Sequence, residues 1–398
     1  VCLGVLQDFG VVGTSTFQKN VGIGSSATPT ERLTVAGGNI SHTMSTPTVL
    51  RSFDFGSYEP NDIEVVGKYA FVVKNNASFL LYKFQILDIS RSSNITSVGT
   101  VDLSTLGDIL LVEGRYAYVG QGEGMYVVDI SDYSKPIVIG QLNDPHINTI
   151  KELKRYGNYL LGAGQQTSTD DNLVIIDVSD PSNPNSLGSV PAAGPTESCA
   201  VASSLDVSGR FAYVACREEG AVSVFDISEP RNPVHLSYFT YSTLENVQSV
   251  IASDNYLYLL RYKSSSVSST LSVVSIVSST ALSYVGHYDI SANTVVGFDK
   301  ADNYVYVPEN GQLSVLDVSD PAAINLSARI VSSTLFNSSR NVSVQGKYVY
   351  TVGSSGNKLV VMDLSGLSTP SANIGSILAG KLRVNEGVNF GGRLTVKD

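Results

Sequence analysis

The sequence predicts an all-β repeat protein, chiefly because a two-part sequence motif occurs seven times. The first part is a short aromatic strand, and the second is an aliphatic strand that ends in Asp-Ile-Ser or a close variant. The leading aromatics are separated by steps of 47, 43, 52, 45, 48 and 44 residues: Tyr69, Tyr116, Tyr159, Phe211, Tyr256, Tyr304 and Tyr348. A period in this range indicates structural repeats that build one body.

Each repeat reads as four antiparallel strands. In the second repeat, segments 108–112, 116–119, 125–130 and 137–142 are rich in β-branched and aromatic residues and are separated by turn signals. A single sheet of this kind has two apolar faces that it cannot bury alone. Radial stacking of seven such sheets buries them, so the sequence predicts a seven-bladed β-propeller with N- and C-terminal strand tails.

Eight segments are candidates for the seven fourth strands. Segment 48–53 precedes the first repeat, and segment 372–377 follows the last. We expect 48–53 to complete the last sheet, because closure by an N-terminal strand removes the seam where a ring can open. Closure by 372–377 is the alternative.

The third strands carry a family resemblance. Residues 173–179 read Leu-Val-Ile-Ile-Asp-Val-Ser, and similar segments stand at 85–90, 127–131, 224–228, 315–319 and 360–365. The chain therefore resembles the LVIVD-repeat β-propellers over about residues 47–378, and this resemblance implies a surface or secreted protein. The fifth repeat departs from the pattern, with Ser275 in place of the Asp. We interpret the repeated Asp as turn chemistry rather than as a ring of catalytic carboxylates.

Both tails differ from the repeats. They alternate apolar and polar residues with Gly punctuation, and they resemble segments of phage tail-fibre and bacterial fibrous surface proteins. We divide the chain into an N-terminal assembly segment (1–46), the propeller (47–378) and a C-terminal assembly segment (379–398). The strands expected to join one subunit to the next include Val1, Leu3, Val5, Arg32, Leu33, Val35, Leu382, Val384, Leu394 and Val396. Pairing of both tails within one subunit, and disorder, are the alternatives.

Composition limits the partners and suggests the compartment. The net charge is -10 without a Lys/Arg stripe, and no apolar run is long enough to span a bilayer, so we expect neither nucleic acid binding nor a membrane span. Cys199 and Cys216 flank a predicted hairpin and form either a disulfide or two buried thiols; Cys2 is left over. Sequons for glycosylation stand at Asn39, Asn76, Asn94, Asn325, Asn337 and Asn341.

The chain shows no pattern for catalysis. Its four His are far apart, and no known nucleophile, metal-ligand or phosphate-binding motif is present. We therefore expect no catalytic residues, no cofactor and no metal. The predicted function is a non-enzymatic extracellular structural or adhesive protein whose tails link it to copies of itself, with a surface glycan or a protein as a further partner. The alternatives are a receptor-binding fibre protein on a phage-like particle that recognises a host glycan, and a propeller enzyme.

Overall fold

The computed structural model describes the chain from residue 48 to residue 363 and two short strands before it. Loop segments outside the described residues are 91–93, 123, 145–146, 167–172, 192–196, 241–244, 264–267, 291–294, 296, 334, 337–338, 347 and 354–356. Strands and turns make up the described part, which contains no helix. In particular, it holds no helix of the length and hydropathy needed to cross a membrane.

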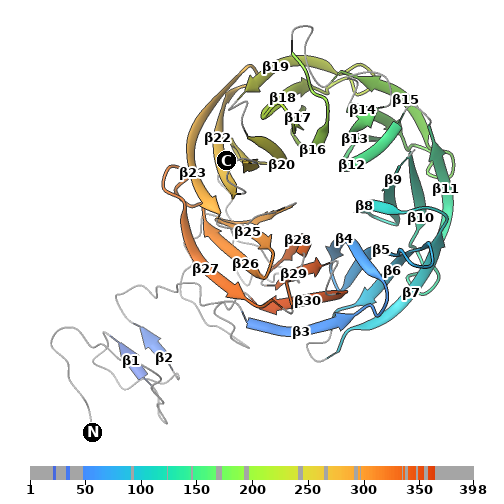
Figure 1. Cartoon of the computed structure of the whole chain (residues 1–398), viewed down its shortest axis with the longest axis horizontal. Coiled ribbons are helices and arrows are strands. Elements are labelled where there is room, and N and C mark those ends of the chain that lie inside the picture. The colour runs from blue at the N-terminus through green and yellow to red at the C-terminus, as the bar shows by residue number, and fades with distance from the viewer. Residues whose placement is uncertain are drawn as a thin grey trace, which may run out of the picture. The chain divides into compact units, whose positions relative to one another are not determined.

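Seven four-stranded antiparallel sheets form the blades of a propeller (Figure 1), as the repeat predicted. The first blade consists of β4 Glu59–Val66, β5 Tyr69–Asn76, β6 Leu81–Asp88 and β7 Thr96–Leu103, and the second of β8 Gly107–Glu113, β9 Tyr116–Gln121, β10 Gly124–Asp129 and β11 Ile137–Asn143. The third blade consists of β12 Ile147–Tyr156, β13 Tyr159–Gln166, β14 Leu173–Asp177 and β15 Asn185–Val190, and the fourth of β16 Ala202–Ser208, β17 Phe211–Cys216, β18 Ala221–Asp226 and β19 Val234–Thr240.

The remaining three blades repeat the pattern, and the last one borrows a strand from the start of the chain. The fifth blade consists of β20 Asn246–Ser253, β21 Tyr256–Lys263, β22 Ser268–Ser278 and β23 Ala281–Ile290, and the sixth of β24 Asp299–Ala301, β25 Tyr304–Glu309, β26 Gln312–Asp317 and β27 Asn325–Val331. The seventh blade consists of β28 Ser339–Gln345, β29 Tyr348–Gly353, β30 Lys358–Asp363 and β3 Thr48–Asp54.

Strand β3 confirms the predicted N-terminal closure. It pairs antiparallel with β30, from Thr48 opposite Asp363 to Asp54 opposite Lys358. Just beyond the strand, the backbone N–H of Phe55 donates to the carbonyl of Asn357 at 2.8 Å. The first and last parts of the propeller are therefore held by a ladder of backbone hydrogen bonds. Residues 364–378, which we assigned to the propeller, lie outside the described residues.

The hydrophobic core lies between neighbouring blades rather than at the centre of the ring. The described residues contain one apolar cluster for each of the seven blade-to-blade interfaces. One cluster, for example, joins Ile63 and Val72 of the first blade to Tyr350 and Leu359 of the seventh. Burying each such side chain contributes about 1.5–3 kcal/mol, so each blade is stabilised by both neighbours.

In five blades the repeated Asp at the end of the third strand forms a turn, as predicted. The Oδ1 atom of Asp129 accepts a hydrogen bond from the N–H of Ser131 at 2.8 Å. Hydrogen bonds from Ser131 and from the side chain of Arg115 lower the pKa of Asp129 to about 2. The same bond is made by Asp88, Asp177, Asp226 and Asp317. These carboxylates fix turns at the rim of the propeller.

The N-terminal tail contains two short strands. β1 Val21–Ile23 pairs in parallel with β2 Leu33–Val35, with Val21 opposite Leu33 and Ile23 opposite Val35. Two of the expected assembly residues, Leu33 and Val35, thus lie in a strand. The others lie outside the described residues: Val1, Leu3, Val5, Arg32, Leu382, Val384, Leu394 and Val396. Linkage between subunits stays a prediction.

Candidate functional site

The first strand of each blade borders the axis of the ring, as Figure 1 shows for β4, β8, β12, β16, β20 and β28. Each of these six strands has a shift of register near its start, for example between Pro60 and Asp62 and between Ile150 and Glu152. A bulge of this kind bends a strand and redirects its side chains. It therefore sets which polar residues meet at the axis.

Two positions on these strands carry most of the charge near the axis. Counted back from the leading aromatic, the position five residues earlier holds Glu64, Lys154, Asp206 and Asp299. The position seven residues earlier holds Asp62, Glu152, Ser204, Ser249 and Asn341. Because alternate residues of a strand point to the same side, the two positions share one face.

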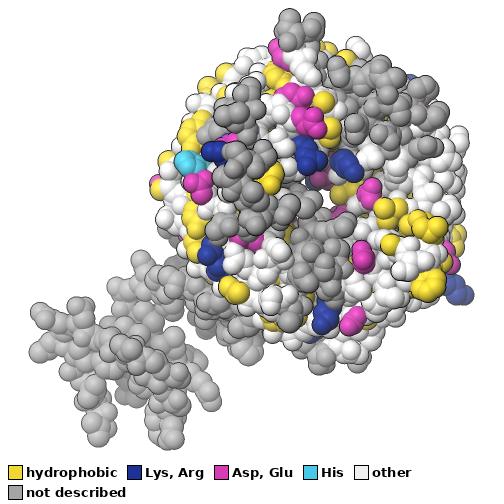
Figure 2. All heavy atoms as spheres, in the orientation of Figure 1, with side chains coloured by type: hydrophobic (Ala, Val, Ile, Leu, Met, Phe, Trp, Pro, Cys, Tyr) yellow, Lys and Arg dark blue, Asp and Glu magenta, His cyan; other side chains and the backbone are white. Residues whose placement is uncertain are grey.

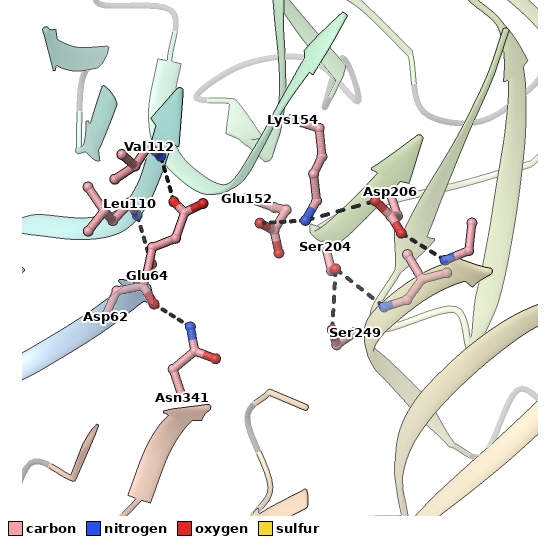
Figure 3. Close-up of polar contacts among 12 residues, drawn as sticks. Asp62, Glu64, Leu110, Val112, Glu152, Lys154, Ser204, Asp206, Ser249 and Asn341 are labelled. Atoms are coloured by element: carbon pink, nitrogen blue, oxygen red, sulfur yellow. Dashed lines mark hydrogen bonds and ion pairs between the residues drawn. The ribbon is translucent and has the colours of Figure 1, made fainter. Parts of the chain in front are cut away.

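Most of these acidic groups bind the backbone of the next blade. Asp62 Oδ2 accepts from the N–H of Leu110 at 2.7 Å, and Glu64 Oε2 accepts from Val112 at 2.5 Å (Figure 3). The pattern recurs further around the ring, where Asp206 accepts from Ala252 at 2.8 Å and Asp299 accepts from Val344 at 2.7 Å. These carboxylates join blades one to two, four to five and six to seven.

Asp62 has the largest number of partners. Its Oδ1 atom accepts from the N–H of Ile63 at 2.7 Å and from the side-chain amide of Asn341 in the seventh blade. Asp62 is only 2% exposed. Burial outweighs these hydrogen bonds and raises the pKa of Asp62 to about 7, and burial likewise raises the pKa of Glu64 to about 8. Both groups are therefore partly protonated near neutral pH.

Lys154 connects the third blade to the fourth. Its Nζ atom lies 3.7 Å from Glu152 Oε1 and 3.9 Å from Asp206 Oδ1 (Figure 3). All three side chains are partly accessible. Attraction to the Glu152 carboxylate raises the pKa of Lys154, while burial raises the pKa of Glu152. The ammonium group thus balances two carboxylates in the channel.

A cavity of about 330 Å³ opens among the starts of the inner strands. Its walls include acidic, basic, amide and hydroxyl side chains, among them Asp62, Glu152, Lys151, Arg217, Gln248 and Ser249. Figure 2 shows Lys or Arg side chains beside the opening at the centre of the ring. A volume near 300 Å³ is at the lower end for small-ligand sites, so the cavity has room for one small polar molecule.

The two predicted cysteines are joined by a disulfide. Cys199 and Cys216 have Cα atoms 5.0 Å apart, and both side chains are fully buried. Arg217, which lines the cavity, follows Cys216 directly, and its N–H donates to the carbonyl of Val201 at 2.9 Å. The disulfide therefore anchors one wall of the cavity. Cys2 lies outside the described residues.

The sequons have different surroundings in the fold. Asn94 and Asn325 are exposed, whereas Asn39 and Asn337 lie outside the described residues. At two of the sequons, the surroundings do not fit the predicted glycosylation. Asn76 is 5% exposed and its amide donates to Ser57 Oγ at 3.0 Å, and the amide of Asn341 is bound to Asp62 in the channel. A glycan on either nitrogen would break these contacts, so neither residue is a suitable acceptor.

Sequence reasoning missed the polar groups near the axis. The sequence shows no pattern for catalysis, yet the fold brings the acidic Asp62 and Glu152 and the basic Lys154 to the axis. The available signal was their fixed offset from the leading aromatic, which is visible only when the repeats are aligned. Among the described residues, no group of three or more His, Cys, Asp or Glu side chains could hold a metal ion.

Comparison with known families agrees with the repeat. The model of the LVIVD repeat matches more than half of the chain, in six segments: 59–103, 108–144, 152–191, 201–240, 301–331 and 338–374. The fifth blade, which carries Ser275 in place of Asp, is the one without a match. No curated protein matches the chain. The similarity of the tails to fibre proteins stays a prediction.

Solved structures with a similar fold include proteins of several kinds. A periplasmic gluconolactonase from Pseudomonas aeruginosa is 15% identical, with a TM-score of 0.56 over 72% of this chain and 86% of that one. A putative 6-phosphogluconolactonase from Bacteroides uniformis is 15% identical (TM-score 0.56, 67% and 83% covered), and the Pan2 WD40 domain from Neurospora crassa is 12% identical (0.57, 82% and 98%). At such low identity these similarities show the propeller fold alone.

Proposed function

We propose that this chain, which belongs to the LVIVD-repeat family, is a non-enzymatic extracellular structural or adhesive protein. Its propeller is a rigid unit, and its terminal strands link it to other copies of the same chain. The main support is that the acidic groups near the axis bind the backbone of neighbouring blades. Asp62, Glu64 and Asp299 each accept a backbone N–H from the next blade. Groups used in this way hold the ring together.

Rigidity is the property that a linking unit needs. The ring is closed by β3, and each blade is packed against both neighbours. The Cys199–Cys216 disulfide adds a covalent link inside the fourth blade. Disulfides persist in oxidising compartments, so this bond supports an extracellular location.

The tails supply the proposed linkage. Segments 1–46 and 379–398 contain the alternating residues expected of strands, and β1 and β2 form a small pair within the first segment. A two-stranded pair has exposed edges, and an exposed edge can accept a strand from another chain. If the N-terminal segment of one subunit joins the C-terminal segment of the next, the contact does not close on itself and yields a filament.

The test is electron microscopy and light scattering on the full chain and on a variant that lacks residues 1–40. We expect filaments from the full chain and single propellers from the truncated variant, with the same thermal stability because β3 is retained. A discrete trimer of the full chain would favour the receptor-binding fibre instead. Assembly that is unchanged by the truncation would refute linkage through the N-terminal segment.

A second candidate is lactone hydrolysis in the channel. Glu152 lines the cavity and lies beside Lys154, which gives an accessible carboxylate next to a cation. In this reaction water adds to the lactone carbonyl, the ring C–O bond breaks, and a hydroxy acid forms. Hydrolysis of glucono-δ-lactone above the uncatalysed rate, lost in Glu152→Gln, would support the enzyme. Equal rates with and without protein would support the non-enzymatic proposal.

A further inference from the structure

The cavity near the axis has an uneven distribution of charge. Lys151 of the third blade and Arg217 of the fourth are exposed at its wall, and neither side chain has a hydrogen-bond or ion-pair partner in the described part of the chain. Three carboxylates also line the cavity: Asp62, Asp108 and Glu152. Glu152 lies 3.7 Å from Lys154, and the oxygens of Asp62 accept hydrogen bonds from Leu110 and Asn341. One side of the cavity therefore carries two cations that are available to a ligand.

Arg217 is held at the wall by its surroundings. It follows the disulfide-bonded Cys216, its N–H donates to Val201, and its carbonyl accepts from Val247 of the fifth blade at 3.1 Å. Because the backbone is held on both sides, the Arg217 side chain begins at a fixed place in the cavity wall. A planar guanidinium can bind a carboxylate through two parallel hydrogen bonds.

The rest of the wall suits hydroxyl groups. Gln248 and Ser249 of the fifth blade offer an amide and a hydroxyl, and Asn341 of the seventh blade also lines the cavity. Amide and hydroxyl side chains both donate and accept hydrogen bonds, and so do the hydroxyl groups of a sugar. The apolar side chains of Ile109 and Phe298 also line the cavity. These features fit a compact ring that carries many hydroxyl groups.

We propose that this cavity binds a sugar acid, with Lys151 and Arg217 on the carboxylate and the amide and hydroxyl side chains on the sugar hydroxyls. The inference goes beyond the linking function, because the cavity can bind a ligand whether or not the tails assemble. The volume of about 330 Å³ limits the ligand to one or two sugar units. The source is either a free sugar acid or the end of an acidic polysaccharide.

The test uses titration calorimetry on the full chain with three probes: glucuronate, glucose and acetate. Glucuronate has both the carboxylate and the hydroxyls, whereas glucose lacks the charge and acetate lacks the ring. We expect glucuronate to bind at least tenfold more tightly than either of the other two. A short oligomer of galacturonate distinguishes the sources, because tighter binding of the oligomer indicates a polysaccharide end.

The variants Lys151→Gln and Arg217→Gln identify the site. Each should weaken glucuronate binding by about tenfold and leave glucose binding nearly unchanged, because one hydrogen bond to a charged group is lost. Lys135→Gln is the matched control, since Lys135 is exposed and does not line the cavity. Melting temperatures equal to that of the parent chain show that the variants fold. Equal affinity for glucuronate and glucose, no glucuronate binding, or full affinity in both variants would overturn the proposal.

Discussion

The side-chain amide of Asn341 donates a hydrogen bond to Oδ1 of Asp62, although the two residues are 279 positions apart in the sequence. They stand at the same place on β28 and β4, the inner strands of the seventh and first blades. The ring is thus closed twice: by the β3–β30 ladder in the outer part of the seventh blade, and by this side-chain contact near the axis. The two closures act at opposite edges of one sheet.

Loss of the Asn341 amide should weaken the inner closure. In Asn341→Ala, buried Asp62 loses a donor, and leaving a buried polar group with fewer partners costs about 1–3 kcal/mol. Urea unfolding measures this difference in the free energy of unfolding. The matched control is Asn94→Ala, because Asn94 is exposed and its removal should change stability by less than about 0.5 kcal/mol. Equal stability of the two variants would contradict the role of this contact.

The raised pKa of Glu64 should make stability depend on pH. Its pKa is about 8 in the folded chain and near 4.5 in the unfolded one, so the folded state binds the proton more tightly. The stability from this group is fully present below about pH 4.5 and is lost as pH rises through about 8. Between pH 5 and 8 the parent chain should therefore lose stability relative to Glu64→Gln, by on the order of a few kcal/mol.

The Glu64→Gln variant removes one titrating group and keeps its hydrogen bond. The glutamine carbonyl can still accept from the N–H of Val112, while the ionisable proton is removed. Groups distant from Glu64, such as His235 with its pKa lowered by burial, are present in both chains and cancel in the difference. Asp62 does not cancel fully, because its pKa of about 7 lies in the same range and its charge acts on Glu64. Parallel curves of unfolding free energy against pH would show that Glu64 does not titrate differently in the folded state.

Reduction of the disulfide should destabilise the chain by about 3 kcal/mol. Cys199 and Cys216 are 17 positions apart, and closing a loop of this length restricts the unfolded state by about that amount. The measurement is urea unfolding with and without a reductant. The double variant Cys199→Ala/Cys216→Ala is the control, because a reductant should not change its stability. A parent chain that is unaffected by complete reduction would contradict this prediction.

The sequence predicted the blades because their signals are local. The aromatic strand, the Asp turn and the third strand lie within one repeat, so each can be read without knowledge of the rest. Closure by β3 was predictable for a related reason, since one fourth strand stood before the first repeat. For the blades and for the closure by β3, the sequence pattern was therefore sufficient to predict the fold.

The site was harder to predict because its parts come from different blades. Asp62 and Asn341 meet only when the ring closes, and no spacing within one repeat indicates that contact. The sequon at Asn76 was misleading for a similar reason, since the triplet carries no information about burial. A position-by-position alignment of the seven inner strands would have shown the shared offsets of Glu64, Lys154 and Asp206.

A glycine in the outer strands gives a direct test of blade packing. A Cβ atom on Gly140 of β11 would lie 2.3 Å from the carbonyl oxygen of Pro181, which belongs to the next blade. Gly99 and Gly286 show the same close approach to the next blade, at 2.2 Å from Tyr133 and 2.5 Å from Pro321. Real Cβ atoms do not come this close to backbone oxygen, so a methyl group must push the blades apart.

Gly140→Ala should therefore destabilise the ring by about 1–3 kcal/mol, the usual cost of overpacking. Gly162→Ala is the matched control within a strand, because its Cβ would meet neighbours at 3.7 Å, an ordinary contact distance. Thermal unfolding of both variants measures the difference. If blades pack on each other as rigid units, only Gly140→Ala lowers the melting temperature. Equal melting temperatures for the two alanine variants would mean that the turn yields without cost and that the outer strands do not fix the spacing of the blades.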